Sequence, residues 1–181
     1  MIPARTIHSD LTVKKTAYAI VFIALGVALS PFTSFPVGIA RVNPTQHFLN
    51  VVIAVLLGPL WAVGSAGAMA LIRNLLGTGT ILAFPGGMIG ALLSGVVYRL
   101  TRSIPAAAIA EVIGTGVIGS LVSALWVAPS FLHKTMSLWA LGASFSASTI
   151  VGSTLAVIAL GALARAGRLP RLGNGGDASR R

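Results

Sequence analysis

Residues 43–76 read NPTQHFLNVVIAVLLGPLWAVGSAGAMALIRNLL, and this stretch decides how the chain folds. No side chain from Phe48 to Ile72 is charged, and a helix needs only about 20 apolar residues to cross a bilayer. Gly58-Pro59 interrupts the run, which forms either one kinked helix or two shorter helices that turn at Gly-Pro. The two alternatives predict five or six membrane crossings for the whole chain.

The composition indicates a membrane protein. Of 181 residues, 55% are hydrophobic and 9% are charged, with a mean hydropathy of +0.91. A soluble domain carries about 25% charged residues, so a soluble enzyme and a large extramembrane domain are both excluded. The sequence contains no cysteine, which excludes disulfides, thiolate catalysis and cysteine-bound metals.

Apolar runs divide the chain into spans. With the Gly58-Pro59 run counted as two helices, the predicted spans cover about 15–30, 44–57, 60–76, 85–101, 106–127 and 138–164. Residues 1–14 are expected to form a polar head, and residues 165–181 a flexible basic tail. A signal peptide is the alternative for the first run, but the long polar head before it and the lack of a secreted domain after it favour a span.

Basic residues decide between five and six spans, because cytoplasmic loops carry an excess of Lys and Arg. With six spans and a cytoplasmic N-terminus, ten of the 13 basic residues face the cytoplasm, and only Arg41, Arg73 and Lys134 face outward. Five spans would place five of them inside and eight outside, against the rule. We therefore expect an all-α, polytopic six-helix transmembrane bundle in the cell membrane, with both termini in the cytoplasm.

The second predicted span is short for a membrane crossing. Pro44–Leu57 would form a helix of about 21 Å that opens at Pro44, against a hydrocarbon core of about 30 Å. The stretch before it, Pro31–Asn43, is irregular. We expect this stretch to dip into the protein from the outer side, because non-helical backbone at membrane depth must lie against protein or a cavity.

Small residues recur at helical spacing and predict close helix packing. One occurs at every fourth position from Ala140 to Ala156, and similar stripes run through Gly86–Ser94 and Thr115–Ser123. Internal packing is the more common role of such stripes. The pair Ala24 and Ala28 in the first span is the best candidate for a surface that docks another membrane subunit.

Polar side chains within a membrane are the first candidates for function, since each is costly unless it is paired. The richest group lies near the outer side and comprises Arg41, Asn43, Gln46, His47 and Asn50. The last three share one face of a helix that begins at Pro44, and their amide and imidazole groups suit a small polar heterocycle. The alternative is a capped helix start in the headgroup region.

A second polar group lies at the end of the third span, where Gly77 and Gly79 allow sharp turns. It comprises Arg73, Asn74, Thr78 and Thr80. A lone Gly-x-Gly without a P-loop lysine does not predict a phosphate-binding loop. Arg73 either takes part in ligand binding or extends to the outer surface.

Glu111 is the only acidic residue within a predicted span. A lone carboxylate at that depth must be paired, hydrogen-bonded or protonated, and Thr115 lies one turn further on the same face. Glu111 contacts a ligand, forms a structural hydrogen bond to a neighbouring helix, or couples transport to protons. Its position toward the inner side argues against direct contact with a ligand held near the outer surface.

Two tryptophans and two serines complete the candidates near the outer side. Trp126 and Trp139 flank the loop that contains His133 and Lys134, and they either anchor the membrane boundary or stack on a planar ring. Ser144 and Ser148 begin the last span and are candidates to line the same outer cavity.

The sequence contains no catalytic motif, no P-loop and no metal-ligand spacing. We therefore expect no enzyme activity, no cofactor and no metal, and any ATP must be hydrolysed by a partner. The net charge of +10 comes mainly from basic residues at the ends of apolar runs, which indicates membrane orientation and not nucleic-acid binding.

Several segments together resemble a known family. They are 43–50, Arg73-Asn74 with 77–79, 84–87, Tyr98-Arg99 and 111–116. With these segments, a Leu57-Gly58-Pro59 turn and six predicted helices, the chain resembles the substrate-binding S component of energy-coupling factor vitamin transporters. It is most similar to the ThiW type, which is associated with the thiazole precursor of thiamine. The resemblance covers about residues 14 to 164.

The resemblance implies a subunit that captures a vitamin precursor from outside, foremost hydroxyethylthiazole, in a cavity capped by the loop after the first helix. It also implies docking, through small residues of the first helix, on a transmembrane coupling subunit that bears two ATPase subunits. Two other functions remain open from the residues. One is a stand-alone secondary transporter that uses Glu111 as a proton site, and the other is a small membrane scaffold protein.

Overall fold

The stretch around Gly58-Pro59 forms two helices, α2 (Pro44–Leu56) and α3 (Pro59–Leu75), which confirms the second alternative. Gly58 between them has a φ of +100°, a backbone conformation that residues other than glycine rarely adopt. Asn43 caps the start of α2, because its Oδ1 accepts a hydrogen bond of 2.9 Å from the backbone N–H of Gln46.

The computed structural model describes residues 4–37 and 40–169. The helix α1 (Ala4–Thr33) leads into an antiparallel hairpin of β1 (Phe35–Val37) and β2 (Ala40–Val42), and the hairpin leads into α2. After α3 come α4 (Ala83–Thr101), a helical rod over 104–132, and α7 (Leu138–Arg165). The rod consists of α5 (Ile104–Ile113), a π-helical segment (Gly114–Gly119), α6 (Ser120–Val122) and a second π-helical segment (Ser123–Leu132).

Helix lengths and composition support an all-α membrane protein. Four helices in the described part of the chain are long and apolar enough to cross a membrane: Asp10–Thr33 within α1, α4, the rod over 104–132, and α7. The helix α2 is apolar but has only 13 residues, and α3 has 17. The number of crossings and the orientation of the termini therefore stay predictions.

The helix α1 begins at Ala4, within the predicted polar head, because no glycine or proline interrupts the chain between Pro3 and Gly26. One segment differs from the expectation. The expected irregular stretch, 31–43, instead forms the end of α1 and the hairpin, in which Phe35 pairs with Val42. The predicted tail from residue 170 onward lies outside the described residues.

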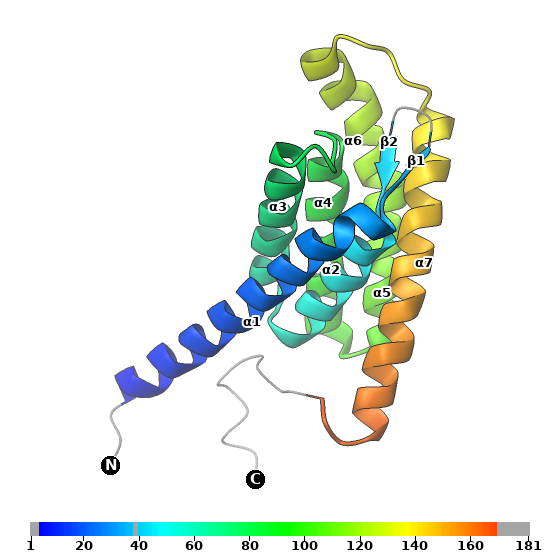
Figure 1. Ribbon diagram of the computed structural model, residues 1–181. Helices are drawn as coiled ribbons and strands as arrows, with labels where there is room; N and C mark the ends of the chain where they lie inside the picture. Colours follow the sequence, from blue (N-terminus) through cyan, green and yellow to red (C-terminus); the bar gives the residue numbers. More distant parts are fainter. Residues whose placement is uncertain (1–3, 38–39, 170–181) are drawn as a thin grey trace.

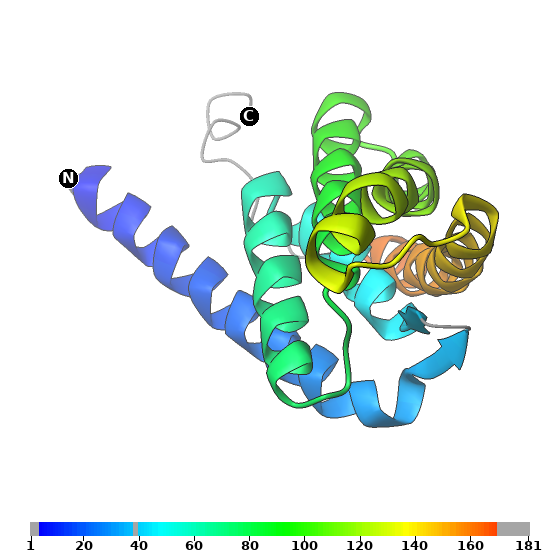
Figure 2. The ribbon, with the colours of Figure 1, turned by 90° about the horizontal axis from the view of Figure 1, so that it is seen from above.

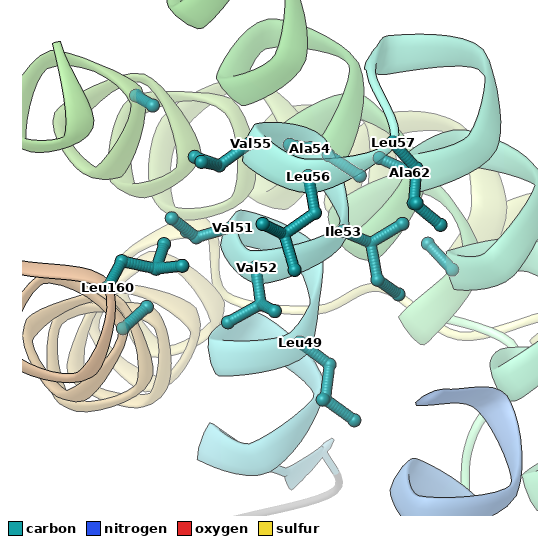
Figure 3. Close-up of a cluster of buried hydrophobic side chains, with 14 of the residues drawn as sticks. Leu49, Val51, Val52, Ile53, Ala54, Val55, Leu56, Leu57, Ala62 and Leu160 are labelled. Atoms are coloured by element: carbon teal, nitrogen blue, oxygen red, sulfur yellow. The ribbon is translucent and has the colours of Figure 1, made fainter. Parts of the chain in front are cut away.

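The helix α2 lies at the centre of the bundle. It contacts α1, α3, α4, α5 and α7, and Figure 2 shows it enclosed between these helices. Ten of its 13 residues are buried, and its apolar side chains from Leu49 onward form the middle of the hydrophobic core, where Leu160 of α7 joins them (Figure 3). By contrast, α1 runs obliquely and its N-terminal half extends beyond the bundle (Figure 1).

The bundle has two distinct ends. One end, called the hairpin end here, carries β1 and β2, the connection between α3 and α4, and the connection before α7 (Figure 1). The other end carries the turn between α2 and α3 and the turn between α4 and α5 (Figure 1). If the predicted orientation holds, the hairpin end faces outward.

The small-residue stripes face the interior, as expected for internal packing. Their buried members are Gly86, Gly90, Ser94, Thr115, Gly119, Ser123, Ser144, Ser148, Gly152 and Ala156. Gly90 packs directly against the polar residues, since a Cβ there would meet Thr115 Oγ1 and would lie 2.6 Å from Glu111 Oε2. The missing side chain thus lets α4 approach α5 at the depth of Glu111.

Candidate ligand-binding site

Glu111 joins α5 to α2 through hydrogen bonds. Its Oε1 accepts from His47 Nδ1 and from Asn50 Nδ2, both at 3.0 Å, and from Thr115 Oγ1 at 3.2 Å. The Glu111 side chain is fully buried. Of the three roles considered for Glu111, this arrangement shows the hydrogen bond to a neighbouring helix, which pairs a carboxylate that would otherwise be costly to bury.

Backbone carbonyls of α4 complete the surroundings of Glu111. Asn50 Nδ2 also donates to the carbonyl of Gly87 at 3.1 Å, and Thr115 Oγ1 also lies 3.0 Å from the carbonyl of Gly86. Both glycines are buried. Three helices, α2, α4 and α5, therefore meet at one polar cluster, which we call the Glu111 cluster: Glu111, His47, Asn50 and Thr115.

Arg73 forms the centre of a second polar cluster, at the end of α3. The other members of this cluster are Ser30, Ser34, Asn43, Gln46 and Thr78. The Arg73 side chain is only 1% exposed, so it does not extend to the surface. The guanidinium donates to Ser30 Oγ at 2.7 Å, to Ser34 Oγ at 3.2 Å, to the Thr78 carbonyl at 3.3 Å and to Gln46 Oε1. Buried arginine is tolerated when its donors are paired, and here neutral oxygens accept from four of the five N–H donors.

Asn43 and Arg41 tie the hairpin to this second cluster. While Asn43 Oδ1 caps α2, its Nδ2 donates to Ser34 Oγ at 2.7 Å and to Ser30 Oγ at 3.2 Å. Arg41 Nη1 donates to the Gly77 carbonyl at 2.9 Å, across to the connection between α3 and α4. The hairpin is thereby held over the start of α2.

A narrow pocket lies between the two clusters at the hairpin end. Its open volume is about 20 Å³, so its lining must move apart to admit a ligand larger than water. Its lining comes from β2, α2, α3, α4, the rod and α7, and comprises Arg41, Val42, Asn43, Gln46, His47, Arg73, Ala83, Gly86, Gly87, Thr115, Phe145 and Ser148. Polar groups converge here on an otherwise apolar bundle, as is typical of small-molecule sites.

Two buried donors at this pocket have no hydrogen-bond partner in the described part of the chain: Gln46 Nε2 and Ser148 Oγ. His47 contributes an acceptor. Because its Nδ1 faces the Glu111 carboxylate, that nitrogen carries the hydrogen, and in the neutral ring Nε2 is then an acceptor. A small molecule held among these groups would therefore need both an acceptor and a donor.

The structure brings together seven of the residues predicted from sequence: Gln46, His47, Asn50, Arg73, Glu111, Thr115 and Ser148 belong to the two clusters or to the pocket. Asn74 and Thr78 hold the connection after α3, since Asn74 Nδ2 donates to the carbonyls of Ala70 and Thr80 and Thr78 Oγ1 to that of Arg73. Ser144 is buried and donates to the Ala140 carbonyl within α7.

Four predicted residues lie away from the pocket. Trp126 and Trp139 are 64% and 87% exposed, and Trp126 packs edge-to-face against Phe131. Both positions suit an anchor at the membrane boundary. Ala24 and Ala28 are exposed on α1, so a docking role for this pair stays a prediction.

Three residues of the site were not predicted from the sequence: Ser30 and Ser34, which bind Arg73, and Phe145, whose ring lines the pocket. Ser30 and Ser34 lie one helical turn apart at the end of the first span, a spacing that places two hydroxyls on one face. Phe145 follows Ser144 in the last span, but a single apolar residue in an apolar helix carries no signal.

Comparison with known protein families identifies one match. A family model described as ThiW, thiamine-precursor transporter protein, matches residues 16–166. The match includes α2, α3, α4, the rod and all the residues of both polar clusters. No curated protein matches the chain.

Proposed function

The chain belongs to the ThiW family of thiamine-precursor transporter proteins, and on this basis we propose that it captures hydroxyethylthiazole, the thiazole moiety of thiamine, for uptake. In this proposal it is the high-affinity binding subunit of a transport system. It is a multi-pass protein of the cell membrane, with six spans and both termini in the cytoplasm.

The observation that carries the proposal is the complementarity between the pocket and this molecule. Hydroxyethylthiazole has a ring nitrogen that accepts a hydrogen bond and a hydroxyl that donates one. Gln46 Nε2 and Ser148 Oγ are donors without a partner among the described residues. His47 lines the pocket, and its Nε2 is an acceptor in the tautomer whose Nδ1 donates to Glu111. Phe145 supplies an apolar surface for the ring.

A separate module would supply the energy for transport. The sequence has no P-loop, so ATP would be hydrolysed by two ATPase subunits that act through a transmembrane coupling subunit. On α1, Ala24 and Ala28 are exposed whereas Ala19 and Gly26 are buried against the bundle. The exposed pair is therefore available to such a partner.

A stand-alone proton-coupled transporter is the second candidate, and one observation favours it. Glu111 Oε2 is buried and has no hydrogen-bond partner in the described residues, although three donors bind Oε1. A carboxylic acid proton on Oε2 would be sheltered from water, as in proton-coupled carriers.

Uptake of labelled hydroxyethylthiazole by cells that lack thiazole synthesis tests both candidates. We expect uptake when the chain is expressed with a coupling subunit and its ATPases, and none when it is expressed alone. Uptake by the chain alone that is lost when the proton gradient across the membrane is dissipated would establish the proton-coupled alternative. Absence of uptake with every coupling module, together with absence of binding, would contradict both.

A further inference from the structure

The arginine residues give the pocket a positive charge. Arg73 and Arg41 both line it, and the hydrogen bonds of Arg73 all go to neutral oxygens of Ser30, Ser34, Gln46 and Thr78. Asp10 and Glu111 are the acidic residues that the structure describes, and Asp10 is exposed near the start of α1. Within the described ranges, no carboxylate pairs with either arginine at the pocket.

Glu111 offsets only part of this charge. It does not line the pocket, and its Oε1 accepts hydrogen bonds from His47 and Thr115, which do line it. Two guanidinium groups and one such carboxylate leave the site with a net positive charge. Moving a cationic ligand from water into this positively charged site is unfavourable.

The neighbours of Arg73 also fix which polar atoms the pocket offers. Because the guanidinium binds Gln46 Oε1, the amide turns its Nε2 donor away from Arg73 and toward Gly87, where a Cβ would lie only 2.5 Å from it. The Ser148 hydroxyl is a second buried donor without a partner among the described residues. A ligand therefore has to present an acceptor atom at this side of the pocket.

We propose that the pocket selects a ligand without positive charge, whose acceptor atom binds beside Gln46 and Arg73, and that it rejects the quaternary thiazolium of intact thiamine. This inference rests on the proposed function, because it concerns the same pocket. It assigns to Arg41 and Arg73 the discrimination between the precursor and the finished vitamin.

Three ligands of similar shape separate the effect of charge from that of the acceptor: hydroxyethylthiazole, the corresponding hydroxyethylthiophene, and N-methylated hydroxyethylthiazolium. The thiophene and the thiazolium both lack the ring acceptor, but only the thiazolium is charged. In calorimetric titrations of the purified chain, we expect the thiazole to bind most tightly. The thiazolium should bind about tenfold or more weaker than the thiophene.

The variant Arg41→Gln tests the origin of the discrimination. Arg41 is exposed and makes one hydrogen bond, to the Gly77 carbonyl, so the variant should fold. We expect it to reduce the ratio between thiophene and thiazolium affinity several-fold, whereas Lys134→Gln, an exposed cation outside the pocket, leaves the ratio unchanged.

Each outcome decides a different claim. Thiazolium binding as tight as that of the thiophene, or an unchanged ratio in Arg41→Gln, would overturn the charge selection while leaving the proposed function intact. If none of the three ligands binds, the proposed function is wrong and the charge selection falls with it.

Discussion

Replacing Glu111 by glutamine tests how the site is held together, because the change keeps the size of the side chain and removes its charge. Oε1 of Glu111 accepts three hydrogen bonds, from His47 Nδ1, Asn50 Nδ2 and Thr115 Oγ1. A hydrogen bond to a charged group contributes about 1.5–3 kcal/mol, and one between neutral groups about 0.5–1.5 kcal/mol. The difference is about 1–1.5 kcal/mol for each of the two N–H donors, from His47 and Asn50, whereas Thr115 Oγ1 can donate to the Gly86 carbonyl instead. The free energy of unfolding should therefore fall by about 2–3 kcal/mol.

Thermal unfolding of the purified protein in detergent measures this loss. For a chain of this size, 2–3 kcal/mol corresponds to a decrease in Tm of about 5–10 °C. Asp10→Asn is the matched control, since Asp10 is the other acidic residue among those described and is exposed. If Glu111→Gln melts at the same temperature as the unmodified protein, the Glu111 carboxylate does not join α5 to α2 and the reasoning is refuted.

The same variant should weaken ligand binding. The glutamine amide can donate a hydrogen bond to His47 Nδ1, and the proton of the ring then moves to Nε2, which becomes a donor at the pocket. We expect hydroxyethylthiazole affinity to fall about tenfold, the effect of losing one hydrogen bond to the ligand. Unchanged affinity would show that His47 does not act as the acceptor.

Three further changes probe the packing, the hairpin and the periphery. Gly90→Ala should lower the free energy of unfolding by about 1–3 kcal/mol, because the added Cβ would lie 2.6 Å from Glu111 Oε2. Gly64→Ala is the control and should cause no such loss, since a Cβ there would have nothing within 4 Å. Equal melting temperatures of the two variants would contradict this. Asn43→Ala removes the α2 cap and the hydrogen bonds to Ser30 and Ser34, so the free energy of unfolding in a denaturant titration should fall by about 1 kcal/mol or more. A smaller loss would mean that another group replaces the cap. Trp139→Phe should leave hydroxyethylthiazole affinity unchanged in a calorimetric titration, since Trp139 is 87% exposed and does not line the pocket; weaker binding would place it in the site.

Local signals predicted the elements of the fold. Asn43-Pro44 marked the start of α2 and Gly58-Pro59 the turn into α3, because capping and backbone restrictions act within a few residues. The small-residue stripes marked the helix faces that pack together. The hairpin was not predicted, because three-residue strands are too short to show an alternating pattern.

Contacts between distant residues could not be predicted in the same way. His47 and Glu111 are 64 positions apart, and no sequence pattern states that α2 and α5 bring them within 3.0 Å. Arg73 was compatible with the surface or the interior, and Ser30 and Ser34, which make its burial possible, lie about 40 residues before it. The candidate residues followed from their chemistry, but their grouping into two clusters required the fold.

The most direct test of the central claim is the dissociation constant of hydroxyethylthiazole measured by calorimetric titration on the purified, unmodified protein. The proposed function predicts saturable binding of one molecule per chain, and substantially weaker binding in folded His47→Ala, whose melting temperature should also fall because the hydrogen bond to Glu111 is lost. Absence of saturable binding of hydroxyethylthiazole to a folded sample would contradict the assignment of this pocket to the thiamine precursor.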